Sequence, residues 1–235
     1  MTAMTLSLRE ARMVLERLVL VAGVDAGLVP SLRECALFSA AHGPVGFEGI
    51  EASMNALRGA DPKRLTMSDE GGKVVLDGHG LHAWYGAHAL IDLLAEQLHN
   101  GLRAEMRVAG FAEPAELRVA VPIGLRQGIS VAINFQDGEA LVNAEHAANG
   151  ADPVMDIILN GTPVDADLWW RLFDESDKAL APDSFESRRH AGALIVEADG
   201  RVIGRQDEDD TDLSMLTGAN KVAAARENFQ KAGQS

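Results

Sequence analysis

The segment His42-Gly43-Pro44 contains the residue that we consider first as a candidate catalytic group, His42. The imidazole of histidine gains and loses a proton near neutral pH, which makes His42 a candidate catalytic acid or base. His42 also falls in the last turn of a predicted helix, where a protonated imidazole would face the negative end of the helix dipole. Both interpretations stay open, and we favour the one in which His42 only closes the helix.

The glycine-rich segment DGHGLHAWYGAH, residues 77–88, offers a second candidate. Gly78 and Gly80 follow a predicted strand and precede a predicted helix, the context in which backbone amides can cradle a pyrophosphate. The glycines could equally form only a turn, and no acidic residue ends a following strand where it would hold a ribose. Gly78 and Gly80 are therefore candidate cofactor-binding residues, and the cofactor itself is not identified.

Three histidines in the same segment, His79, His82 and His88, could be interpreted as metal ligands. Their spacings of three and six do not bring all three to one face of a helix, and no cysteine joins them. We therefore predict no metal site, and expect these histidines to be solvated or packed.

The segment SFESRRHAGA places two arginines, Arg188 and Arg189, beside Ser187 and His190 in an acidic chain. A forked guanidinium suits a carboxylate or phosphate, so Arg188, Arg189 and Ser187 are candidate substrate-binding residues. The alternative is that the arginines pair with the chain's own excess of acids. A serine next to a histidine does not indicate a hydrolase here, because the sequence has no G-x-S-x-G motif.

Charge and composition limit the classes of partner. The chain has 235 residues, 47% of them hydrophobic, and a net charge of −14, which would repel a phosphate backbone. No apolar run approaches the ~20 residues that cross a bilayer. A single cysteine, Cys35, favours the reducing cytoplasm. We therefore expect a cytoplasmic protein that binds neither nucleic acid nor membrane.

Helical spacing dominates the first sixty residues. The capping box Ser7-Leu-Arg-Glu10 predicts a helix start, a second helix opens at Pro30 and ends at His42, and a third precedes Gly59. Later in the chain, we expect helices over 83–100 and after Asp165. The composition and pattern predict one domain over 1–235, with a helical unit at 1–60, a mixed body at 61–215 and a peripheral helix at 216–235.

Strand patterns follow the exposed connection GADPKRLTMSDEGG. KVVLD and AEMRV are typical of strands, as are ELRVAV and PVMDIIL, although a helix is not excluded for the last. ISVAINFQ-DG-EALVN is the clearest hairpin, with a two-residue turn at Asp137-Gly138, and a second hairpin is expected about Asp199-Gly200. The order of elements predicts an α+β fold, in which the N-terminal helical unit packs on a mixed sheet with β-hairpins.

Three segments form a pattern at the two ends of the chain: LSLREA and GLVPSLRECALFSAAHG near the start, and DADLWWRLFDESDKALAPDSFESRRHAGA near the end. This pattern resembles an uncharacterised bacterial domain family of unknown function. Members of that family share a Leu-Trp helix and a Pro-x-Ser/Thr-x-x-Ser-Arg segment, which Pro182, Ser184, Ser187 and Arg188 match. The hairpin LIVEADGRVIGR departs from the pattern, and the resemblance implies no activity.

The first hundred residues are also similar to the N-terminal part of the malate/lactate/sulfolactate dehydrogenase-like family. That resemblance implies a catalytic role for His42, in a Ser-His-Gly motif whose serine is replaced here by Ala41, and a role for Asp77-Gly78. The later Asn-Pro, Ala-Thr-Ser and Lys-Gly-rich cofactor segments of the family are missing from the sequence.

Two functional hypotheses follow. In the first, the chain is an enzyme-like relative of these dehydrogenases that acts on a small hydroxy or oxo acid, with His42 moving the proton and Arg188 or Arg189 holding the carboxylate. In the second, it is a non-catalytic ligand-binding or accessory subunit on the same scaffold. The dehydrogenase likeness and three tryptophans also suggest a homodimer. The sequence does not decide whether the protein is an enzyme.

Overall fold

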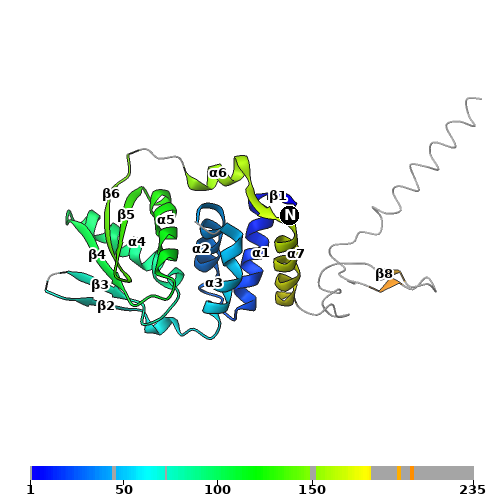
Figure 1. Cartoon of the computed structure of the whole chain (residues 1–235), viewed down its shortest axis with the longest axis horizontal. Coiled ribbons are helices and arrows are strands. Elements are labelled where there is room, and N and C mark those ends of the chain that lie inside the picture. The colour runs from blue at the N-terminus through cyan, green and yellow to red at the C-terminus, as the bar shows by residue number, and fades with distance from the viewer. Residues whose placement is uncertain are drawn as a thin grey trace, which may run out of the picture. The chain divides into compact units, whose positions relative to one another are not determined.

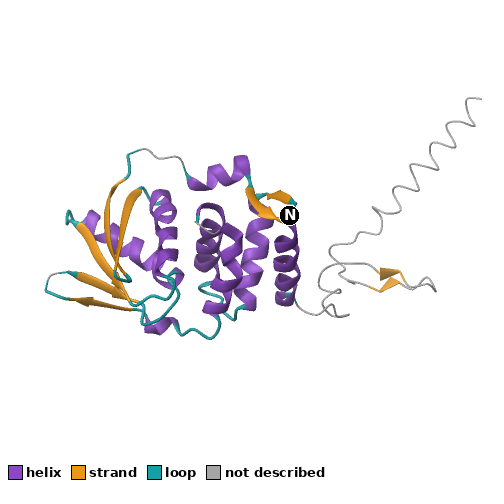
Figure 2. Ribbon diagram, in the orientation of Figure 1, coloured by secondary structure: helices purple, strands orange, loops and turns teal. Residues whose placement is uncertain are grey.

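The computed structural model of the chain describes residues 2–43, 46–71, 73–148 and 152–180 in full, and the backbone alone at 195–196 and 202–203. The chain divides into two compact units, Met1–Leu180 and Ala181–Ser235. The first combines helices with a mixed sheet, which confirms the predicted α+β class (Figure 1 and Figure 2). In the second, β8 (Ile195–Val196) pairs antiparallel with β9 (Val202–Ile203), as the second predicted hairpin requires.

One half of the first unit is helical. It consists of α1 (Leu8–Val21), α2 (Val29–His42), α3 (Ile50–Leu57) and α7 (Ala166–Ser176). The predicted capping box starts α1: Ser7 Oγ accepts from the amide of Glu10, and the Glu10 carboxylate accepts from the amide of Ser7 at 2.9 Å. Helix α7 comes from late in the chain, is capped by Asp165 as predicted, and packs along α1 (Figure 1).

A two-stranded sheet ties the two ends of this unit together. Strand β1 (Ala3–Leu6) pairs antiparallel with β7 (Thr162–Asp165). Gly161 turns the chain into β7 at φ 67°, and a Cβ there would lie 2.5 Å from Thr5 Cγ2. The sequence predicts neither strand. Each has only four residues, and the two that pair lie at opposite ends of the unit in sequence.

The other half is a five-stranded sheet in the order β2-β3-β4-β6-β5. Its strands are β2 (Thr66–Asp69), β3 (Val74–Asp77), β4 (Ala104–Ala109), β5 (Ile129–Gln136) and β6 (Glu139–His146). Strands β3 and β4 are parallel and are joined by α4 (Trp84–His99), whereas the other neighbours are antiparallel. The predicted β5–β6 hairpin is confirmed, with Asp137 and Gly138 at φ 52° and 81°, as a type I′ turn needs.

Helices separate the sheet from the helical half. Helix α4, α5 (Ala120–Arg126) and the 3₁₀ helix η3 (Pro114–Val119) pack on α2, and α4 and α5 also pack on the sheet (Figure 1). On the covered face Met106, Val108 and Val142 are buried, whereas on the open face Arg107 binds Glu70 and Glu139. The N-terminal helices therefore reach the sheet through α4, η3 and α5. Three further 3₁₀ helices are η1 (Gly46–Gly49), η2 (Pro62–Arg64) and η4 (Asp177–Ala179).

Two segments predicted as strands are helical instead. PVMDIIL lies in α6 (Pro153–Asn160), where Asp152 Oδ1 accepts from the amide of Val154 at 2.9 Å and Pro153 occupies the first turn. ELRVAV lies in η3 and α5, and η3 again begins at a proline, Pro114. Periodicity cannot separate a short buried strand from a helix, and the proline at the helix start is the more informative signal. The segment GADPKRLTMSDEGG, predicted as an exposed connection, also contains the strand β2.

Some predictions concern residues that the structure does not describe, and others are not tested by it. The peripheral helix at 216–235 lies outside the described residues. The single domain over 1–235 stays a prediction. Within the described residues, every helix is too short or too polar to traverse a bilayer.

Candidate functional site

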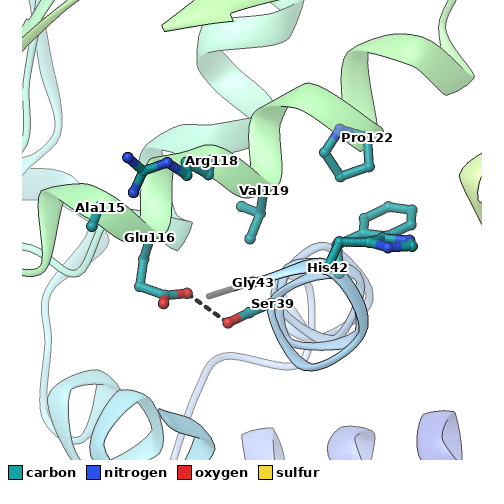
Figure 3. Close-up of a pocket in the computed structure, with 9 residues that line it drawn as sticks. Ser39, His42, Gly43, Ala115, Glu116, Arg118, Val119 and Pro122 are labelled. Atoms are coloured by element: carbon teal, nitrogen blue, oxygen red, sulfur yellow. Dashed lines mark hydrogen bonds between the residues drawn. The ribbon is translucent and has the colours of Figure 1, made fainter. Parts of the chain in front are cut away.

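A small hollow lies where the end of α2 meets η3 and the start of α5 (Figure 3). Its lining includes His42, the residue singled out by the sequence, and also Ser39, Glu116 and Arg118. The volume of about 20 Å³ that a water-sized sphere can enter holds roughly one water molecule, so a ligand of a few heavy atoms would project from the hollow into solvent.

Glu116 is the most firmly held polar side chain of the hollow. Its Oε2 accepts two hydrogen bonds, from Ser39 Oγ at 2.7 Å and from Trp84 Nε1 at 3.0 Å. Ser39 and Trp84 are 3% and 1% exposed, so both donors are fixed by packing. Within the described residues, no hydrogen bond or ion pair to Glu116 Oε1 is formed, and this oxygen keeps its capacity to accept.

Arg118 lies two residues further along η3. Its guanidinium carbon is 4.7 Å from the centroid of the Phe135 ring, a cation–π contact with β5. Figure 3 shows the guanidinium and the Glu116 carboxylate on opposite sides of the η3 ribbon, with the carboxylate turned toward Ser39. Neither residue is a candidate from the sequence, where ELRVAV is interpreted only as a strand. Pro114 followed by Glu116, a typical start of a helix, is the signal that could have found them.

His42 takes the position that the helix-closing interpretation predicts. It is the last residue of α2, and the amide of Gly43 closes the helix by donating to Ser39 O at 2.9 Å. The imidazole is exposed and stacks on Phe38, with ring centroids 6.0 Å apart and planes 24° apart. In Figure 3 the ring lies near Pro122 and points away from Glu116 and Arg118. A catalytic role for His42 stays a prediction.

The loop after β3 uses its own backbone donors. The amides of Gly78 and Gly80 donate to Ala109 O and Gly110 O, so the loop continues the parallel pairing of β3 with β4. The amide of His79 donates to Asp77 Oδ1 at 2.8 Å, and that of Leu81 to Gly78 O at 2.9 Å. With these four amides engaged, this conformation offers a pyrophosphate no free backbone amide from residues 78–81. Cofactor binding by Gly78 and Gly80 stays a prediction that the geometry does not support.

An aromatic ring explains one of these glycines. The ring of Phe111 occupies the space beside the loop, where a Cβ on Gly78 would lie 2.5 Å from it and a Cβ on Gly86 only 2.4 Å. Such distances leave room for no side chain. Because Gly78 and Gly86 have no side chains, the ring of Phe111 can approach the backbone of the loop and of α4.

The three histidines of the segment have different surroundings. His79 is exposed, and its Nε2 lies 2.8 Å from Thr66 Oγ1. His82 is 1% exposed; its Nδ1 accepts from the amide of Trp84 at 3.3 Å, and burial lowers its pKa to about 4. Burial also lowers the pKa of His88, whose Nε2 lies 3.4 Å from Glu34 Oε2 without hydrogen-bond geometry. In the described part of the chain, no three such side chains form a metal-binding group.

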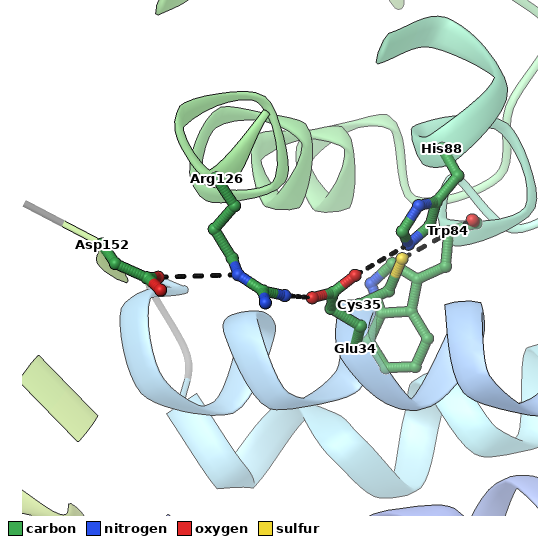
Figure 4. A network of polar contacts seen from close by, with 6 residues as sticks. All are labelled: Glu34, Cys35, Trp84, His88, Arg126 and Asp152. Carbon is green, nitrogen blue, oxygen red and sulfur yellow. Dashed lines mark hydrogen bonds and ion pairs between the residues drawn. The ribbon is translucent and has the colours of Figure 1, made fainter. Parts of the chain in front are cut away.

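A polar network next to His88 joins four helices (Figure 4). Arg126, at the end of α5, contacts Glu34 of α2 and lies 3.5 Å from Asp152, the cap of α6. Cys35 is fully buried beside it and its thiol lies 3.7 Å from Trp84 O, so burial raises the pKa of the thiol. A thiol in this state is a poor nucleophile, and we assign the network a structural role.

The candidate substrate-binding residues Arg188, Arg189 and Ser187 lie outside the described residues. The structure therefore neither brings them to the hollow nor separates them from it. Comparison of the chain with models of protein families and with curated proteins gives no match. The two resemblances stay predictions.

Proposed function

We propose that the chain is a ligand-binding protein whose hollow takes a small hydroxy acid. The single observation that carries the proposal is Glu116, whose Oε2 is held by Ser39 and Trp84 while Oε1 has no partner among the described residues. A carboxylate oxygen accepts from a hydroxyl and repels an anion, so the hydroxyl end of the ligand faces Glu116.

The acid end of the ligand has a different neighbour. The C-terminal end of α2 carries partial negative charge and Glu116 is a carboxylate, so the inner part of the hollow disfavours the acid group of a ligand. Arg118 lines the same hollow, is exposed, and carries a forked cation that binds carboxylates well. A 2-hydroxy acid carries a hydroxyl for Glu116 and a carboxylate for Arg118 in one small molecule.

The enzyme hypothesis remains as a second candidate because His42 lines the same hollow. It requires the imidazole to turn toward the bound hydroxyl, since the ring now stacks on Phe38. It also requires a nicotinamide cofactor, for which the engaged amides of Gly78 and Gly80 provide no support. A non-catalytic or accessory role therefore fits the geometry better.

A titration with glycolate, lactate and malate, followed by calorimetry and tryptophan fluorescence, tests the proposal. The decisive variant is Glu116→Gln, because Ser39 and Trp84 both donate and so hold the amide oxygen, which turns the NH₂ group toward the ligand. Exchanging an acceptor for a donor should weaken binding about tenfold to a hundredfold while leaving the melting temperature nearly unchanged. Ser68→Ala, on the exposed strand β2, is the matched control.

Equal affinity of Glu116→Gln and the native chain, or no binding of any of the three acids, would contradict the proposal. Binding of NADH in the micromolar range would favour the enzyme hypothesis instead. The titration therefore distinguishes the two functions as well as testing the site.

A further inference from the structure

The two edges of the five-stranded sheet differ in length and charge. At one edge, β2 has four residues and includes Asp69. At the other, β5 has eight residues, none of them ionisable and none a proline. Edge strands usually carry charges, prolines or bulges that discourage pairing with another chain, and β5 has neither charge nor proline.

Hydrogen bonding within the hairpin determines which groups of β5 face outward. The two-residue turn makes Gln136 and Glu139 a hydrogen-bonded pair, and at the other end Gly128 O accepts from the amide of Ala147 at 2.8 Å. Even-numbered residues therefore bond to β6, and the N–H and C=O groups of Val131, Ile133 and Phe135 point away from the sheet. No other segment of the described chain bonds to these groups.

We propose that β5 pairs antiparallel with β5 of a second copy, so that the two sheets become one continuous sheet. A strand that pairs with itself in this direction satisfies two-fold symmetry, and an axis normal to the sheet keeps both helical layers on the same side. Strand addition of this kind uses the outward backbone groups that β5 leaves unpaired.

The register follows from α5. A Cβ placed on Gly124 would lie 3.1 Å from Ile129 O, so α5 covers the first outward carbonyl of β5 and excludes it from pairing. The pairing is therefore centred on Ile133, with Val131 opposite Phe135 of the partner subunit. Apolar side chains meet on the helical side, and Ala132 lies opposite Asn134 of the partner subunit on the open side.

Charge favours this edge over other surfaces. A chain with a net charge of −14 tends to repel a second copy, whereas β5 itself carries no charge and the nearby guanidinium of Arg118, over Phe135, is a cation. Ile133 and Phe135 are half-buried in the single chain and gain cover from their counterparts.

Sedimentation of the full chain at about 10 µM tests the inference, with a dimer expected for the native protein. In the variant Ala132→Asp with Asn134→Asp, new carboxylates would lie directly opposite each other, and dimerisation should weaken at least about tenfold. Both side chains are exposed on the open face, so the variant should fold. The matched control, Met67→Asp with Ser68→Asp, adds the same charge to β2 and should leave the dimer intact.

Hydrogen exchange of the native chain provides a second measurement that needs no variant. The amides of Val131, Ile133 and Phe135 should be protected at 10 µM and lose protection on dilution. A monomeric native chain, a dimer unaffected by the β5 variant, equal loss in the control, or exchange independent of concentration would each overturn the proposal.

Discussion

The loop after β3 and the hollow beside η3 are both rich in polar groups, and they differ in how many of these groups the fold has already used. In the loop, the amides of residues 78–81 donate to neighbouring backbone or to Asp77. In the hollow, Ser39 and Trp84 both donate to one oxygen of Glu116, and the other oxygen is left available. A sequence motif supports binding only where the folded chain leaves its donors and acceptors unsatisfied.

The largest expected effect on the free energy of unfolding comes from Gly110→Ala, which disrupts the loop after β3. Gly110 has φ 69°, and a Cβ there would lie 2.0 Å from Asp77 Oδ1, which also accepts from His79 N. Overpacking and backbone strain together should lower the free energy of unfolding by about 3 kcal/mol. Gly101→Ala is the control, because Gly101 has the same φ and no atom within 4 Å of its Cβ position.

The control should lose only about 1 kcal/mol, from backbone strain alone. Urea unfolding of both variants measures the difference. Similar losses in the two variants would show that the contact between Gly110 and Asp77 does not constrain the loop.

A pH titration addresses the buried histidine at the end of the same loop. The pKa of His82 falls from the ordinary 6.5 to about 4 on burial, so between these values the unfolded chain binds a proton that the folded chain does not. Stability attributable to His82 is therefore complete above pH 6.5 and is lost as the pH falls toward 4, by about 3 kcal/mol in all.

In His82→Asn this loss should disappear, because asparagine can still accept from the amide of Trp84 and does not titrate. Urea unfolding of both proteins at pH 7, 5.5 and 4 provides the comparison. If the native chain and the variant lose stability in parallel over this range, His82 is not the titrating group.

The smallest expected effect on stability is that of His42→Ala, which tests the role of His42 in the hollow. If His42 only closes α2, the variant should lose up to about 1 kcal/mol of stability and bind the hydroxy acid as the native chain does. A catalytic His42 would instead change turnover about 10²–10⁴-fold with little effect on folding. Melting temperature, affinity and turnover measured on this one variant separate the two roles.

Local signals predict several helix starts and one hairpin turn, but they predict neither the helices α5 and α6 nor the hollow. The capping box at Ser7, the side-chain cap at Asp165 and the turn at Asp137-Gly138 act between neighbouring residues, and each is found as predicted. The hollow depends instead on Ser39, Trp84 and Glu116, which come from three elements far apart in sequence. The strand β2 and the β1–β7 pair were missed for the same reason, because their partners are set by tertiary contacts.

The pairing of β1 with β7, and of α1 with α7, has a consequence for synthesis. The ion pair between Arg17 and Asp177 joins residues 160 positions apart, so α1 receives α7 as a neighbour only after the five-stranded sheet has been made. Helices α1 to α3 leave the ribosome with one side uncovered, and that side stays exposed throughout elongation. A nascent chain arrested before residue 166 should therefore be a better chaperone client than the completed protein.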